Sequence, residues 1–206
     1  MLLQIYPENP NPKHIQTIIE CLNDGGIVIF PTDTVYGMGC DIFKHKAVEK
    51  IASIKGIKLE KANFSFICYD LSHISDYTKQ ISNNAYKLMK KALPGPFTFI
   101  LEANNNVPKL FQSKKKTVGI RIPDNEIIRL IVKELGHPIM STSVHDEDEV
   151  IEYTTDPELI HEKYADLVDI VVDGGYGDNE ASTVVDCTND EFEIIRQGKG
   201  ILEDYL

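Results

Sequence analysis

Residues 30–39 read Phe30-Pro31-Thr32-Asp33-Thr34-Val35-Tyr36-Gly37-Met38-Gly39. The apolar run at 27–30 enters this stretch after two glycines, and its β-branched and aromatic side chains predict a buried strand. Pro31 cannot donate a hydrogen bond to a neighbouring strand, so the strand should end there and a polar turn over 31–39 should follow. Open α/β sheets bind ligands at such strand ends. The alternative is a capped turn whose threonine and aspartate side chains bond the local backbone.

Composition is typical of a globular protein. The chain has 206 residues, of which 42% are hydrophobic and 26% charged, and this suits one α/β domain over 1–206. The sequence contains no long apolar run and no signal-peptide pattern, so we expect a cytoplasmic protein without a transmembrane helix. The four cysteines form no C-x-x-C pair and the histidines no H-x-x-x-H pair, so we infer no redox motif and no metal site from protein motifs.

Charge is distributed unevenly along the chain. Residues 146–193 carry a formal charge of −16 against −11 for the whole chain, which leaves +5 for the remainder. The overall sign argues against a general nucleic-acid binder. The asymmetry still allows a basic face on an acidic protein, although an acidic stretch is more often a solvated surface.

Apolar periodicity predicts alternating helices and strands. Several strands follow one another without a helix between them, so the sheet should mix parallel and antiparallel pairs, with helices flanking it. Asp124 is placed to cap the fourth helix. The expected helices cover 13–23, 46–54, 82–92, 124–135 and 157–165, and the expected strands cover 27–30, 64–68, 97–101, 117–122, 138–140, 167–172, 182–186 and 192–196.

Two polar side chains are predicted to share one face of a strand. Thr117 and Arg121 are four residues apart, and side chains alternate along a strand, so both should point the same way. Arg121 can hold a carboxylate with two parallel hydrogen bonds, and Thr117 can bond a phosphate or ribose oxygen. The alternative is a structural arginine paired with a carboxylate from the acidic stretch 146–193.

Three further clusters could bind anions, and each also has a plainer interpretation. Lys55 and Lys61 flank a glycine-containing loop suited to phosphates, but a lysine-rich loop is more often simply exposed. The triplet 114–116 consists of lysines that would attract RNA or remain solvated. Ser141-Thr142-Ser143 follows a short strand and is typical of either a site or a capping turn.

Six segments in order give the chain a resemblance to the YrdC/YciO-like family, which includes the threonylcarbamoyl-AMP synthases. The resemblance runs from about residue 15 to 200 and implies a YrdC-like fold with a concave basic cavity. Its segments are 30–39, 55–61, 93–98 (Leu-Pro-Gly-Pro-Phe-Thr), 117–121, 141–145, and 182–186 (Ser-Thr-Val-Val-Asp) with the later Arg196-Gln197-Gly198.

The chain departs from the synthase pattern at three positions. Ile57 stands where the family carries an arginine, and Phe66 stands where synthases carry a histidine near threonine. Val144-His145 replaces the usual Ala-Asn. These changes place the chain closer to the YciO-like branch and weaken the expected nucleotide site, because isoleucine has no donors for phosphate oxygens.

The resemblance implies the reaction of ATP, L-threonine and bicarbonate to threonylcarbamoyl-AMP and pyrophosphate, for threonylcarbamoyladenosine formation in tRNA. No residue is identified as a covalent nucleophile, and Mg²⁺ is expected with the nucleotide. The residues implied on the threonine side are Thr34, Arg121, Ser141 and Ser182, and those on the nucleotide side are Lys55, Lys61, Thr117, Ser143 and Arg196.

A second hypothesis belongs to another class. The chain would be a non-catalytic or weakly active protein of the same fold that binds double-stranded RNA, tRNA or a nucleotide in the basic cavity. Threonine-dependent pyrophosphate release separates the two hypotheses. The sequence implies no membrane partner and does not indicate an oligomeric state.

Overall fold

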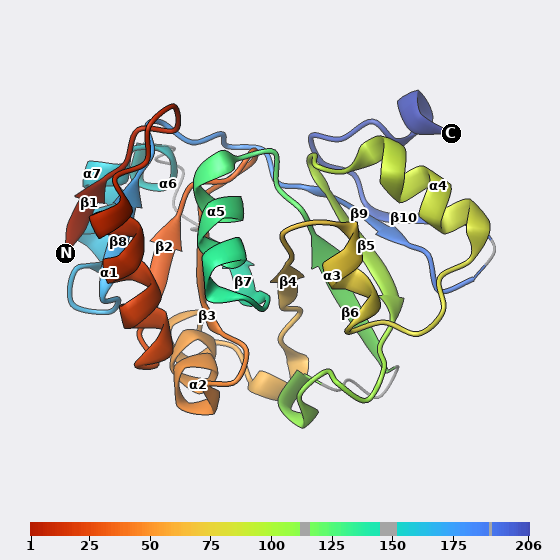
Figure 1. Ribbon diagram of the computed structural model, residues 1–206, viewed down its shortest axis with the longest axis horizontal. Helices are drawn as coiled ribbons and strands as arrows, with labels where there is room; N and C mark the ends of the chain where they lie inside the picture. Colours follow the sequence, from red (N-terminus) through yellow and green to blue (C-terminus); the bar gives the residue numbers. More distant parts are fainter. Residues whose placement is uncertain (112–115, 145–151, 190) are drawn as a thin grey trace.

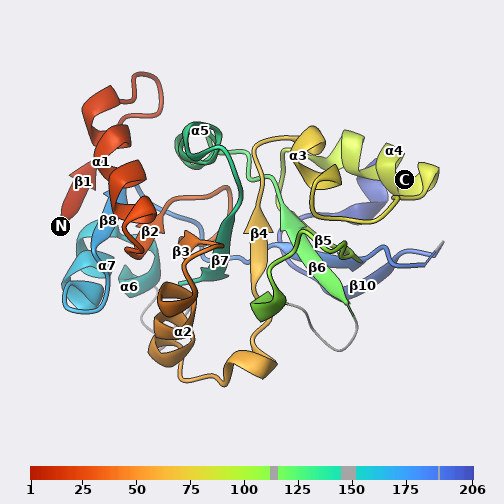
Figure 2. The same cartoon turned by 60° about the horizontal axis from the view of Figure 1, so that its bottom comes forward.

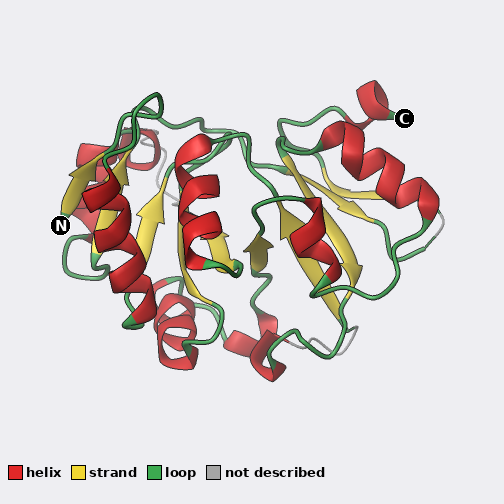
Figure 3. Ribbon diagram, in the orientation of Figure 1, coloured by secondary structure: helices red, strands yellow, loops and turns green. Residues whose placement is uncertain are grey.

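The computed structural model describes every residue except 112–115, 145–151 and 190. A ten-stranded sheet crosses the molecule, and helices pack on both of its faces (Figures 1 and 3). The helices are α1 (Pro12–Asn23), α2 (His45–Ile54), α3 (Leu71–Ser75), α4 (Asn83–Ala92), α5 (Glu126–Leu135), α6 (Glu152–Thr155) and α7 (Pro157–Tyr164), with 3-10 turns η1 (Leu59–Lys61), η2 (Lys109–Phe111) and η3 (Leu202–Tyr205). The strands are β1 (Leu2–Gln4), β2 (Val28–Phe30), β3 (Gly37–Asp41), β4 (Ser65–Ile67), β5 (Phe97–Glu102), β6 (Thr117–Arg121), β7 (Ile139–Ser143), β8 (Ile170–Asp173), β9 (Thr183–Asp186) and β10 (Glu193–Arg196).

The sheet mixes both kinds of pairing, as predicted. Its strand order is β1-β8-β2-β3-β7-β4-β6-β5-β9-β10. The pairs β1–β8, β2–β8, β4–β6 and β5–β9 are parallel, and the other five are antiparallel. In this order, the central strands β3, β7, β4 and β6 join an N-terminal half, which contains β1, β2 and β8, to a second half, which contains β5, β9 and β10.

Strand register divides the side chains between two faces, which we call face A and face B. Directly paired residues share a face, so the pairs that link Phe30, Gly37, Ser141, Gly119 and Arg121 place all of them on face A. Their immediate neighbours along each strand point to face B. The side chains of face B include Met38, Met140, Phe66, Ile120 and Phe99.

The helices cover these faces unequally. On face A, α1 and α5 bury the apolar side chains of the N-terminal half, among them Val28, Phe30 and Ile170. Face B is buried along both halves, by α2 and α7 at one end and by α3, α4 and η3 at the other. Figure 2 shows α1 and α5 on one side of the N-terminal half and α2 and α7 on the other. Among the described residues, no helix covers face A of β5, β6, β9 and β10.

The structure corrects several boundaries. Residues 37–39 belong to β3 and not to the turn; a Cβ at Gly39 would lie 2.2 Å from the Met140 carbonyl oxygen, so glycine lets these strands approach. The helix α5 is capped by Asn125, whose side chain accepts from the backbone N–H groups of Ile127 and Ile128, and not by Asp124. The sequence analysis missed β1 and the short helices α3 and α6.

The remaining expected elements lie within a few residues of their predicted positions. None of the helices in the described ranges is long and apolar enough to cross a membrane.

Candidate functional site

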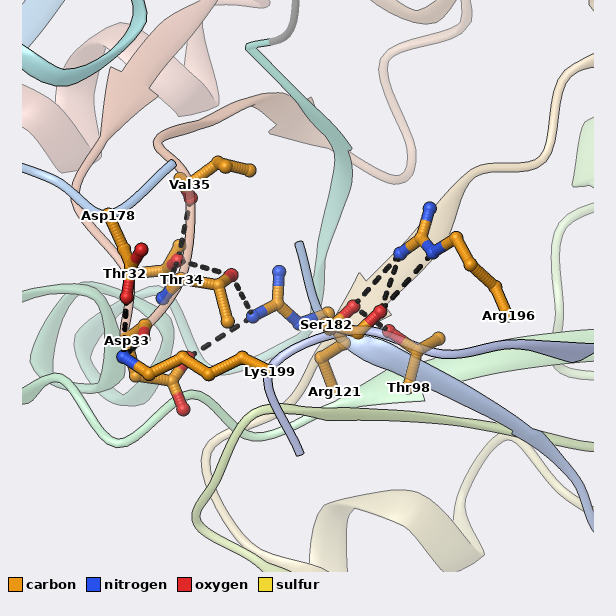
Figure 4. A network of polar contacts seen from close by, with 10 residues as sticks. All are labelled: Thr32, Asp33, Thr34, Val35, Thr98, Arg121, Asp178, Ser182, Arg196 and Lys199. Atoms are coloured by element: carbon orange, nitrogen blue, oxygen red, sulfur yellow. Dashed lines mark hydrogen bonds and ion pairs between the residues drawn. The ribbon is translucent and has the colours of Figure 1, made fainter. Parts of the chain in front are cut away.

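A polar cluster occupies the uncovered part of face A. It combines the loop after β2 with side chains from β5, β6 and β10 and from the residues on either side of β9 and β10 (Figure 4). These side chains come from positions far apart in the sequence. They meet because β6, β5 and β9 are neighbours in the sheet. The cluster consists of Thr32, Asp33, Thr34, Thr98, Arg121, Asp178, Ser182, Arg196 and Lys199.

The loop after β2 is both a capped turn and part of the cluster. Thr32 makes the local bonds: its Oγ1 accepts from the Thr34 backbone N–H at 3.0 Å and donates to the Val35 carbonyl at 2.7 Å. Those bonds hold the backbone so that Asp33 and the Thr34 hydroxyl turn toward Arg121 (Figure 4). The interpretation as a capped turn therefore applies to Thr32, and membership of the polar cluster around Arg121 applies to Asp33 and Thr34.

Arg121 is the buried centre of the cluster, at the end of β6. Its Nη2 donates to Thr34 Oγ1 at 3.0 Å and to Asp33 Oδ1 at 3.2 Å. The side chains of Arg121 and Asp33 are only 8% and 10% exposed, so this ion pair is largely removed from water. Its carboxylate partner comes from the loop after β2, which overturns the alternative that the stretch 146–193 supplies it.

The Arg121–Asp33 pair is incompletely satisfied. Arg121 Nε and Asp33 Oδ2 are buried and have no hydrogen-bond partner among the described residues. Burial lowers the pKa of Arg121, Asp33 opposes this shift, and the nearby positive charge of Arg196 adds to it. A guanidinium stays charged in proteins even so, and an unmet buried hydrogen bond to a charged group is costly. The site thus contains a donor and an acceptor with unused bonding capacity.

Arg196 lies on the other side of Ser182 in the view of Figure 4. Its Nη2 donates to the Ser182 carbonyl at 2.8 Å and to Ser182 Oγ at 3.3 Å. Ser182 Oγ also lies 2.9 Å from Thr98 Oγ1. Two residues expected on different substrates, Ser182 and Arg196, are therefore in direct contact. In the described part of the chain Arg196 has no carboxylate partner, so its charge is not neutralised locally.

Lys199 connects the segment after β10 to the loop after β2. Its Nζ donates to the Asp33 carbonyl at 2.9 Å and pairs with Asp178 Oδ2 at 2.7 Å. The bond from Lys199 lowers the pKa of Asp178. Beside this pair lies a cleft of about 540 Å³, lined by Thr32, Asp33, Thr155, Tyr176, Gly177, Asp178, Asn179 and Lys199.

The sequence analysis missed four members of this cluster: Asp33 as the arginine's partner, Thr98, Asp178 and Lys199. Asp33 sits inside the opening motif, and Lys199 directly follows Arg196-Gln197-Gly198, so both stood next to a recognised signal. Thr98 ends the recognised segment 93–98, whereas Asp178 had no such signal, because only the path of the loop before β9 brings it to the site.

Lys55 and Ser143 are also brought together. Lys55, at the end of α2, donates from its Nζ to the carbonyl of Ser143, at the end of β7, over 3.1 Å. Burial lowers the pKa of Lys55, and the charge of Lys163 adds to that effect. Ser141 is 2% exposed and lies on the same face, directly paired with Ser65 of β4. The predicted serines therefore line β7 toward the open region.

Other predicted residues lie farther away. Thr117 shares face A with Arg121, but it lies four positions earlier on the strand, a distance of about 13 Å along β6. Lys61 is exposed in η1. Phe66 points to face B, where its ring packs edge-on against Tyr77 and Phe111, whereas Ser65 lies on face A.

Two of the sequence predictions, the change at His145 and the lysine triplet 114–116, fall wholly or partly on residues that the structure does not describe. His145, Lys114 and Lys115 lie outside the described residues. Lys116, the last of the lysine triplet, is exposed and has a positive φ of 52°.

The chemistry available to the cluster is recognition and charge stabilisation. The hydroxyls of Thr98 and Ser182 bond each other, and Ser182 Oγ also accepts from Arg196, so neither hydroxyl is paired with a base that would activate it as a nucleophile. Among the described residues, no group of three or more His, Cys, Asp or Glu side chains could hold a metal ion. The guanidinium groups of Arg121 and Arg196 belong to the same cluster, which suits a ligand, or a pair of ligands, with more than one anionic group.

Comparison with known proteins gives consistent results. The family model for Sua5, YciO and YrdC proteins, described as telomere recombination, matches residues 20–198. An uncharacterized protein of Haemophilus influenzae is 40% identical over 203 residues, which is 98% of this chain and 97% of that protein. The threonylcarbamoyl-AMP synthase of Coxiella burnetii is 27% identical over 173 residues, covering 84% of this chain and 91% of the synthase.

Two solved structures share the fold. The crystal structure of Escherichia coli YciO superimposes with a TM-score of 0.91 at 36% identity and covers 100% of this chain and 99% of that one. The crystal structure of P. abyssi Sua5 complexed with L-threonine superimposes with a TM-score of 0.85 at 25% identity, over 96% of this chain and 57% of the Sua5 chain.

Proposed function

Because the chain belongs to the Sua5/YciO/YrdC family, we propose that it forms threonylcarbamoyl-AMP and pyrophosphate from ATP, L-threonine and bicarbonate. The product would supply threonylcarbamoyladenosine modification of tRNA. The YciO relative of Escherichia coli is described as uncharacterized, and the named synthases are more distant, so the activity is a proposal for this chain.

One observation carries the proposal most directly: the buried arginine with unused bonding capacity. Arg121 is held by Thr34 and Asp33 but keeps an unpartnered Nε, and a carboxylate is the natural acceptor for a guanidinium edge. A relative with the same fold is described as complexed with L-threonine. In our proposal the threonine carboxylate binds at Arg121, with Thr34, Ser141 and Ser182 around it.

The nucleotide would bind beside the amino acid. Arg196 supplies a positive charge that no described carboxylate neutralises, and Lys55 reaches the end of β7 next to Ser143. Lys61 and Thr117 would contribute from the edges of the open region. Mg²⁺ would be held by the nucleotide's phosphates and water, since the described residues form no protein metal site.

The proposed reaction needs positioning more than covalent chemistry. The threonine amine attacks the carbon of bicarbonate, forming the N–C bond of a carbamate as a C–O bond breaks and water leaves, and one carbamate oxygen then attacks the α-phosphorus of ATP. The new bond joins carbamate oxygen to phosphorus, and the bond from phosphorus to the bridging oxygen breaks to release pyrophosphate. Arg196 and Lys55 would stabilise the negative charge that builds up on the phosphates, and the fixed Arg121 would hold threonine in line.

The test combines activity with binding. Pyrophosphate release from ATP and bicarbonate should depend on added L-threonine. L-Threonine at millimolar concentration should also raise the melting temperature, because a ligand bound only by the native state stabilises it. Arg121→Ala should abolish that shift. Arg129→Ala is the matched control, since Arg129 lies on α5 over the ring of Tyr69, 5.5 Å from its centre. The absence of both threonine effects in the unmodified protein would refute the proposal.

A further inference from the structure

The two unpartnered atoms of the Arg121–Asp33 pair have opposite chemical needs. Arg121 Nε is a donor that lacks an acceptor, and Asp33 Oδ2 is an acceptor that lacks a donor. Both side chains are at least nine-tenths buried. Nearby protein groups do not meet these needs: Thr34 Oγ1 is engaged by Nη2, and Lys199 bonds the Asp33 carbonyl, not its carboxylate.

The pair is also electrically neutral. The Asp33 carboxylate, 3.2 Å from the Arg121 guanidinium, repels an anion, so this pair binds an isolated anion more weakly than a lone arginine would. Arg196 provides the contrast within the same cluster, since it bonds the neutral Ser182 and has no acidic partner among the described residues. Arg196 therefore suits a ligand group with net negative charge, whereas the Arg121–Asp33 pair suits one that carries both charges.

We propose that Asp33 is a specificity residue that binds the ammonium group of a zwitterionic α-amino acid while Arg121 binds its carboxylate. The ligand's carboxylate accepts from Arg121 Nε, and its ammonium donates to Asp33 Oδ2, so both buried atoms gain partners. This inference rests on the proposed function, and it adds the amino acid's ammonium as a recognised group. It makes this half of the site selective against carboxylic acids that lack an amine and against amines that lack a carboxylate.

The experiment compares three ligands on the unmodified protein by calorimetric titration: L-threonine, 3-hydroxybutyrate, which lacks the ammonium, and L-threoninol, which lacks the carboxylate. A hydrogen bond to a charged group changes affinity by about ten- to a hundredfold when one partner is removed. Each truncated ligand should therefore bind at least about tenfold more weakly than L-threonine.

Asp33→Asn then identifies the residue that reads the ammonium. Asparagine keeps an oxygen for Arg121 but loses the negative charge, so threonine affinity should fall while 3-hydroxybutyrate affinity stays or rises. The tenfold preference should shrink to about threefold or less. Asp186→Asn is the matched control, because Asp186 is half-buried on the same sheet face and bonds Thr188, away from the pair. It should leave the preference unchanged.

The outcomes separate this inference from the proposed function. If L-threonine and 3-hydroxybutyrate bind the unmodified protein within threefold of each other, the zwitterion site is refuted while the proposed function stands. Retention of the full preference in folded Asp33→Asn also refutes it. If none of the three ligands binds, both the inference and the proposed amino-acid substrate are refuted.

Discussion

The two halves of face A use the same strand geometry for opposite purposes. In the N-terminal half the side chains on this face are Val28, Phe30 and Ile170, and they are buried beneath α1 and α5. In the second half the same face displays Arg121, Thr98 and Ser182, with no described helix above them. Face B, by contrast, contributes a large apolar core that is buried beneath helices in both halves.

The difference shows how one sheet acquires a site. Helices on both faces of the N-terminal half bury apolar side chains and stabilise the fold. Where face A has no helix over it, polar side chains of the strands contact loops from elsewhere in the chain. The burial of Arg121 then comes from those loops and not from a helix. Stability and recognition should therefore respond differently to changes in the two halves, and the following predictions test this from the largest effect to the smallest.

The largest effect is expected in the covered half. Phe30→Ala removes a ring that is 1% exposed, packs under α1 and α5 and closely approaches Gly37 and Gly39. Its loss should lower the free energy of unfolding by about 3–5 kcal/mol. Ile100→Ala, on the open half of face A and only partly buried, should lower it by about 1 kcal/mol. Urea unfolding followed by circular dichroism measures both. Equal losses would contradict the division of the sheet.

The next effect tests the buried ion pair. Arg121→Met leaves the Asp33 carboxylate largely buried without its partner, which should lower the free energy of unfolding by about 3 kcal/mol. Adding Asp33→Leu removes the unpaired charge and should restore most of that loss, although neither variant should bind threonine. The same urea measurement applies to the single and double variants. A double variant no more stable than Arg121→Met would show that the pair does not act as a unit.

A smaller gain is expected in the loop after α2. Ile57 is 39% exposed, so an arginine there does not require repacking of the core. Ile57→Arg should raise the rate of pyrophosphate release about tenfold if the new guanidinium contacts the triphosphate in the transition state.

Ile57→Gln is the control for side-chain size without charge. Phe66→His should add nothing to this gain, because the Phe66 ring is 1% exposed and packs on face B against Tyr77 and Phe111. Unchanged release by folded Ile57→Arg would show that the triphosphate does not approach this loop.

The smallest effect concerns the exposed Lys199–Asp178 pair. Lys199→Ala should lower the free energy of unfolding by less than about 1 kcal/mol, since exposed pairs contribute little. The pKa of Asp178 is lowered in the folded protein, so its contribution is complete above the ordinary value of 3.8 and is lost as the pH falls through the lowered pKa. The stability difference between the two proteins should therefore be constant near neutral pH and shrink in acid.

Urea unfolding of both proteins across that pH range checks this prediction. A difference that grows in acid would contradict the sign. A difference of several kcal/mol at neutral pH would mean that the cleft beside Tyr176 depends on Lys199 for its fold.

Local sequence signals predicted the elements well where apolar periodicity was strong. The helices α1, α2, α4 and α5 and the strands β2, β5, β6 and β9 lie where periodicity placed them, because each buries one clear apolar face. Strand β3 was missed because its two glycines are typical of turns, and only their contact with Phe30 and Met140 explains them as strand residues.

The site was harder to predict, for a different physical reason. Arg121 and Thr34 were both candidates from the sequence and are in contact in the structure, but the identity of the arginine's carboxylate partner depends on which loop covers it. The face on which Phe66 lies depends on a register of one residue, and a slip of one residue reverses every side chain of a strand. Such choices are made by the tertiary fold and leave no local pattern.

The order of the chain has a consequence for biosynthesis. The site takes Asp33 from the first fifth of the chain, Arg121 from its middle, and Arg196 and Lys199 from its last segment, while β1 pairs with β8 across a separation of 169 residues, from Leu2 to Val171. Pairings of such long range form slowly and late. A nascent chain emerging from the ribosome thus has its opening motif exposed long before Arg196 and Lys199, which complete the polar cluster, are synthesised.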